Sequence, residues 1–152
     1  MRNRWFALLI GVALAMVSTS SAFADTGGGG GSDLGLDAVT ISAGSVVSKT
    51  GVVTLTGSIA CSQDLEASVF ADVAQPVGRF KTVRGFGFVS VSCLAADGSA
   101  DFTLAVFADQ GKFAAGTVRV SANAETGFCD VSGDPCFFDS VSFGPESIRL
   151  RR

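Results

Sequence analysis

Hydrophobic and polar residues alternate with a period of two along most of the chain after Asp37, which predicts half-buried β-strands. The clearest segments are 52–61, 88–93, 101–106 and 117–124. Their predicted inward positions are Val53, Leu55, Ile59, Cys61, Val89, Val91, Cys93, Phe102, Leu104, Val106, Val118, Val120, Ala122 and Ala124. Less regular strands are expected at Ala38–Ala43, Glu66–Ala74, Phe137–Phe143 and Ser147–Leu150.

Clusters of Gly, Ser, Asp and Asn interrupt these segments, and no segment after the N-terminal region carries a capped 3.6-residue apolar stripe. The pattern predicts an all-β fold, namely a two-sheet immunoglobulin-like antiparallel sandwich of seven to nine strands. A small barrel is the alternative architecture. The glycine-bearing stretch RGFGF (Arg84 to Phe88) is interpreted as a bulge or tight bend, because isolated glycines in strands often mark one.

The N-terminal region has the layout of a secretory signal peptide. Arg2 and Arg4 precede an uncharged apolar run, and a small-residue segment ends in an A-x-A site at Ala24. We therefore expect residues 1–24 to be cleaved, residues 25–36 to be a Gly-rich flexible linker and residues 37–152 to form the domain. The expected location is extracellular or cell-envelope associated, with no membrane span after cleavage.

Cleavage changes the composition, because the only tryptophan and both methionines lie within the signal peptide. The mature chain then has no His, Trp, Tyr or Met. Loss of Arg2 and Arg4 reduces the basic residues from 11 to nine against 14 acids, a net charge of −5. This acidic balance gives no reason to expect nucleic acid as a partner.

The four cysteines, Cys61, Cys93, Cys129 and Cys136, all lie in the exported part, where an oxidising compartment favours disulfides. Four cysteines allow three connectivities, and the sequence alone excludes none of them. Strand parity and proximity favour the pairs Cys61–Cys93 and Cys129–Cys136. We interpret the second pair as closing a structural loop.

Metal and catalytic chemistry find little support in the sequence. Zinc and histidine-dependent nucleophiles are disfavoured because histidine is absent, and no closely spaced C-x-x-C redox pair occurs. Calcium remains a minor alternative around Asp130, Asp134, Asp139 and Glu125, whose spacing fits no EF-hand loop. We expect no enzyme, no catalytic residue and no cofactor.

Eleven phenylalanines are the only aromatic residues of the mature chain. Most of them belong in a core, but some could converge on one open end of the fold and form an apolar ligand cleft. The candidate cleft residues flank the glycine stretch or follow the last cysteine: Phe80, Phe86, Phe88, Phe137, Phe138 and Phe143.

Two resemblances bear on the fold. The segments GVVTLTGSIAC, QPVGRF and GKFAAGTVRVSANA resemble a group of uncharacterised secreted bacterial domains of actinobacterial type, which implies an exported immunoglobulin-like β-sandwich and no particular activity. The C-terminal order, a short cysteine-closed loop followed by FGPESIRL, is similar to that of neocarzinostatin-type apoproteins. That resemblance implies a two-disulfide sandwich. The first bridge of that family is short, whereas Cys61 and Cys93 are 32 residues apart, so no ligand-contacting residue is transferred.

The function expected from these observations is a secreted non-enzymatic domain that binds or presents a surface. The expected partner is a protein, an envelope polymer or a small apolar ligand. Two alternatives are a carrier of a small hydrophobic ligand and a protease inhibitor that presents the loop from Asp130 to Pro135 between Cys129 and Cys136.

Overall fold

The computed structural model of this chain describes residues 34–129 and 136–152. The expected signal peptide, most of the expected linker and the loop 130–135 lie outside the described residues. The proposed inhibitory segment and two of the candidate calcium ligands, Asp130 and Asp134, therefore lie outside them as well.

The described residues fold into seven β-strands and contain no helix, which confirms the all-β class. The strands are β1 (Leu36–Val46), β2 (Val53–Cys61), β3 (Leu65–Val77), β4 (Lys81–Cys93), β5 (Ser99–Ala108), β6 (Gly116–Cys129) and β7 (Cys136–Arg151). The two strands expected at 137–143 and 147–150 are one strand, β7. It bulges at Gly144 and Pro145, which are joined by a cis peptide and have no partners in the ladder with β6.

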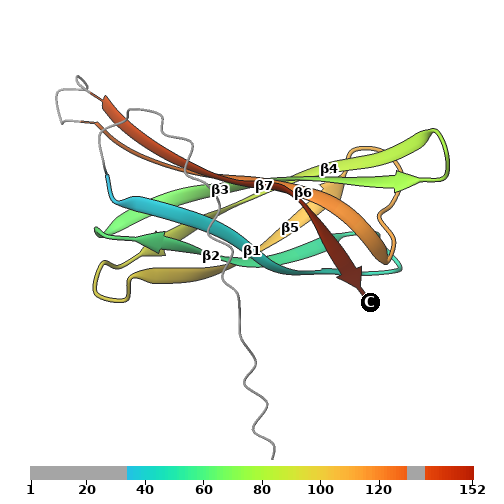
Figure 1. The fold of residues 1–152 in the computed structure, drawn as a ribbon, viewed down its shortest axis with the longest axis horizontal. Helices are drawn as coiled ribbons and strands as arrows, with labels where there is room; N and C mark the ends of the chain where they lie inside the picture. The colour runs from blue at the N-terminus through green and yellow to red at the C-terminus, as the bar shows by residue number, and fades with distance from the viewer. Residues whose placement is uncertain (1–33, 130–135) are drawn as a thin grey trace, which may run out of the picture.

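The strands close into a barrel in the order β1-β2-β5-β4-β3-β6-β7, the architecture given above as the alternative to a sandwich. All neighbours are antiparallel except β1 and β7, which run parallel. The β3–β4 hairpin extends beyond the barrel at one end and the β6–β7 hairpin at the other (Figure 1). The predicted inward residues lie in one core inside this barrel, where Val89 alone is partly exposed.

Two short ladders, which we call the seams, complete the barrel. At the first seam β4 and β5 share only the pairs Gly85–Ala108 and Phe86–Phe107. At the second, β1 and β7 share only Gly44–Leu150 and Ser45–Arg151. The other ladders have seven to 13 pairs each.

The glycines of the RGFGF stretch serve the first seam, so our interpretation of them as a bulge or bend is wrong. The β3–β4 ladder runs through this stretch without a register shift. A Cβ atom on Gly85 would lie 2.2 Å from the carbonyl oxygen of Phe107, and one on Gly87 would lie 2.3 Å from that of Ala105. Glycine is present here because the β5 backbone approaches β4 too closely for any side chain.

One end of the barrel is closed by the loop between β5 and β6, where Phe113 is fully buried. The buried side chain of Gln75 on β3 holds this loop by two hydrogen bonds. Its Nε2 donates to the carbonyl oxygen of Ala114 (2.8 Å), and its Oε1 accepts from the Ala114 amide (2.9 Å). The QPVG and FAAG motifs of the sequence therefore have a structural role: they fasten the loop that plugs this end.

Both expected disulfides are present. Cys61 on β2 and Cys93 on β4 are buried and bridge the core near the opposite end of the barrel. Cys129 and Cys136 join the exposed ends of β6 and β7. Two disulfides and no free cysteine fit an oxidising, extracellular environment.

Candidate functional site

The six phenylalanines proposed for a ligand cleft do not come together. Phe80 is fully exposed in the turn between β3 and β4, whereas Phe137 and Phe138 lie on the β6–β7 hairpin at the other end. Phe143 is buried in the core. Only Phe86 and Phe88, on β4, share a surface, and that surface is the outside of the barrel. The residues do not line one cleft because they occupy both ends, the outer wall and the interior.

A different aromatic cluster forms on the outer wall. Phe86 and Phe88 of β4 lie beside Phe70 of β3, with ring centroids 6.1 Å and 6.4 Å from that of Phe70. Phe107 of β5 is the direct cross-strand partner of Phe86 at the first seam. We call these four residues, Phe70, Phe86, Phe88 and Phe107, the aromatic face. Three are exposed, with 45% of Phe86, 66% of Phe88 and 61% of Phe107 accessible to solvent, and Phe70 is half-buried.

The position of this face follows from strand parity. Successive side chains of a strand point to opposite sides, so the inward glycines of β4 oblige Phe86 and Phe88 to point outward. On β3 the core residues are Val69, Ala71 and Val73, which turns Phe70 out. The same holds for Phe107, which follows the buried Val106.

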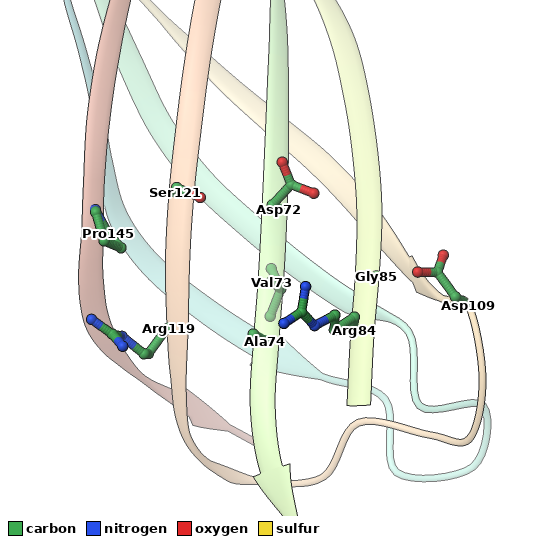
Figure 2. A pocket seen from close by; sticks show the side chains of 9 residues that line it. All are labelled: Asp72, Val73, Ala74, Arg84, Gly85, Asp109, Arg119, Ser121 and Pro145. Carbon is green, nitrogen blue, oxygen red and sulfur yellow. The ribbon is translucent and has the colours of Figure 1, made fainter. Parts of the chain in front are cut away.

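Charged residues border the aromatic face on one side. Figure 2 shows Asp72 and Arg84 on the neighbouring strands β3 and β4, Arg119 on β6 and Asp109 just beyond β5. With Val73, Ala74, Gly85, Ser121 and Pro145 they line an open pocket of about 420 Å³. None of these four charged groups forms an ion pair with another described residue. The border therefore offers both signs of charge to a partner.

Sequence reasoning missed Phe70 and Phe107. The pattern carries a signal for Phe107, which follows the predicted inward residue Val106 and so has outward parity. It carries none for Phe70, because no inward positions are predicted within the strand expected at Glu66–Ala74. A phenylalanine at an outward position of a strand is unexpected in a protein that only needs a soluble surface. Two or more of them on adjacent strands indicate a contact surface.

A second open pocket, of about 430 Å³, lies at the end of the barrel that the β6–β7 hairpin overhangs. Its lining residues are Leu34, Gln63, Asp64, Leu65, Glu66, Thr126, Gly127 and Phe128. Asp139, one of the candidate calcium ligands, accepts a hydrogen bond from the Leu36 amide (3.4 Å). Among residues 34–129 and 136–152, no group of three or more His, Cys, Asp or Glu side chains is arranged to hold a metal ion.

The chain matches no protein-family model, and no curated protein matches it either. Within the described part of the chain there is no helix of the length and apolarity needed to cross a membrane.

Proposed function

We propose that this protein is a secreted, non-enzymatic binding domain that engages a protein partner through its aromatic face. The observation that carries the proposal is the exposure of Phe86, Phe88 and Phe107 side by side on one wall. At about 200 Å² for a fully exposed phenylalanine, their accessible fractions correspond to roughly 350 Å² of aromatic surface. The core of a protein interface of about 800 Å² per partner is commonly built around such a patch.

The shape and composition of the surface favour a protein over a small ligand. The four rings lie on an outer wall, whereas drug-sized ligands are bound in concave sites that enclose most of their surface. The nearby Arg84 and Arg119 add a residue type that is enriched in protein interfaces, together with aromatic residues. The surface is less suited to binding a sugar polymer, because the mature chain has neither Trp nor Tyr to provide an amphipathic ring platform.

We further propose that the barrel is immunoglobulin-like. Strands β1-β2-β5 and β4-β3-β6-β7 form two groups with long internal ladders, and the seams that join the groups have two residue pairs each. Seven strands in two such groups are typical of an immunoglobulin-like sandwich whose edges have come together. The aromatic face then lies mainly on the four-stranded group and extends over the first seam to Phe107.

The proposal is tested by capture experiments with the mature, oxidised protein. It is immobilised and exposed to secreted and cell-envelope proteins from the cells that make it. A Phe86→Ser/Phe88→Ser variant is tested in parallel. The control is Leu94→Ser, which removes a similarly exposed apolar side chain outside the aromatic face. We expect a saturable protein partner to be retained by wild type and control and lost from the double variant. Equal retention on all three proteins contradicts the proposal.

A further inference from the structure

The outer wall around the aromatic face is a regular grid of side chains on β4, β3 and β6. Four rows cross these strands in register: Arg84–Ala74–Arg119, Phe86–Asp72–Ser121, Phe88–Phe70–Asn123 and Ser90–Ser68–Glu125. Every one of these residues is exposed or half-buried. With strands about 4.8 Å apart and rows about 6.7 Å apart, the Cα atoms of the grid span roughly 10 Å by 20 Å.

This grid is electrically balanced in an otherwise acidic protein. It carries two cations, Arg84 and Arg119, and two anions, Asp72 and Glu125. None of the four forms an ion pair with a described residue, although Glu125 Oε1 accepts a hydrogen bond from the side-chain Nδ2 of Asn123 (2.6 Å). A neutral region that carries both signs is the part of an acidic molecule that can approach an identical molecule without net repulsion.

The arrangement of the rows is also self-complementary. Consider a two-fold axis that runs parallel to the rows, midway between the second and third rows and above the buried Ala71. This axis places the first row of one copy on the fourth row of the other, and the second row on the third. In this arrangement Phe86 of one copy faces Phe88 of the other, and Arg119 faces Glu125. Each contact occurs twice, as an isologous interface requires. No like charges face each other.

Two other two-fold arrangements of the same grid oppose like charges. An axis along β3 would place Arg84 of one copy on Arg119 of the other. An axis along the second row would place Asp72 on its own copy. Like charges directly opposed across an interface are costly, so the charge pattern favours the axis over Ala71 above these two.

We propose that the protein forms a homodimer through this grid, with the phenylalanines in its two middle rows and the Arg119–Glu125 pairs at its β6 edge. The inference rests on the proposed function and names its partner as a second copy of the chain. Asp72 enters the interface against Phe70 of the other copy. Arg84 lies diagonally across the β3–β4 ladder from Asp72 and supplies the balancing positive charge on the same part of the grid.

Sedimentation equilibrium of the mature, oxidised protein between about 1 and 200 µM tests the dimer, since this range brackets micromolar affinities. We expect reversible dimerisation that Leu94→Ser leaves unchanged. The Phe86→Ser/Phe88→Ser variant should weaken it at least tenfold, because a few buried aromatic residues carry most of the energy of an interface. Circular dichroism and a thermal midpoint confirm that each variant is folded.

Charge reversal tests the axis. Arg119→Glu and Glu125→Arg should each weaken the dimer by about threefold to tenfold, as expected for rim charges that the symmetry repeats. The double variant Arg119→Glu/Glu125→Arg should return to within about twofold of wild type, because the rim pairs form again with reversed sign. Single variants that have no effect, or a double variant weaker than both, would overturn this arrangement.

The dimerisation and capture experiments together distinguish failure of the homodimer from failure of the proposed binding function. A protein that stays monomeric up to about 200 µM overturns the homodimer as an interaction of ordinary affinity. If capture of a different protein still depends on Phe86 and Phe88, the binding function stands without it. If neither dimerisation nor capture responds to these phenylalanines, both proposals fall.

Discussion

Both seams close the barrel, but they differ in whether they can accommodate an added side chain. At the β4–β5 seam the close contact is between a strand and the backbone of its neighbour, because Gly85 and Gly87 lie against the carbonyl oxygens of Phe107 and Ala105. At the β1–β7 seam the nearest atom to a Cβ on Gly44 would be Cδ2 of Leu150, at 2.7 Å. A side-chain end can move aside, whereas a paired backbone cannot. The comparison predicts that the first seam is rigid and the second adaptable.

The largest effect is expected for Gly85→Ala. Its methyl group would lie 2.2 Å from the Phe107 carbonyl oxygen, so β4 and β5 must separate and their two-pair ladder must break. We expect a loss of about 3 kcal/mol or more in the free energy of unfolding, at or beyond the upper end of overpacking costs. Urea unfolding of the oxidised protein measures it, with Ser90→Ala on the outward side of β4 as control. A loss below about 1 kcal/mol would show that this seam can open freely.

A smaller effect is expected for Gly44→Ala. The added methyl group meets Leu150 Cδ2 at 2.7 Å and Leu55 Cδ2 at 3.1 Å, both at the ends of rotatable side chains. Repacking these leucines should cost about 1 to 2 kcal/mol, within the usual range for one inserted methyl group. The same urea experiment provides the number. The contrast between the seams is lost if Gly44→Ala and Gly85→Ala are equally destabilising.

The smallest effect is expected for Phe107→Ser, which removes an outward ring from the first seam. The backbone pairs are untouched, so only the cross-strand contribution of Phe107 beside Phe86 is lost, about 0.5 to 1 kcal/mol. A thermal melt and urea unfolding would both report it. A loss comparable to that of Gly85→Ala would mean that the rings, and not the backbone, hold this seam together.

Much of this fold could be predicted from the alternation of side chains along the chain. The predicted inward residues of 52–61, 101–106 and 117–124 lie in the core, and both favoured disulfides are formed. Barrel closure was given only as an alternative, because it depends on two residue pairs at each seam, which no local pattern encodes. The glycines of RGFGF were misread for the same reason: their constraint comes from β5, a separate strand.

The candidate site was predicted only in part. Nearness in sequence to the glycine stretch or to the last cysteine points to six phenylalanines. The structure brings Phe86 and Phe88 together on the aromatic face and distributes the other four elsewhere. Phe70 and Phe107 are distant in sequence from Phe86 and Phe88. They join the site through strand order, which places β3, β4 and β5 side by side. Parity shows which residues face outward, but it does not show which strands are adjacent.

The alternation within β4 also has a practical consequence for protein engineering. Its inward glycines allow the close approach of β5, while its outward side chains point away from that contact. Positions 70, 86, 88 and 107 can therefore be randomised together in a display library while the fold is retained. With its buried disulfide and its fastened loop, the barrel offers a small, histidine-free scaffold on which new recognition surfaces can be selected.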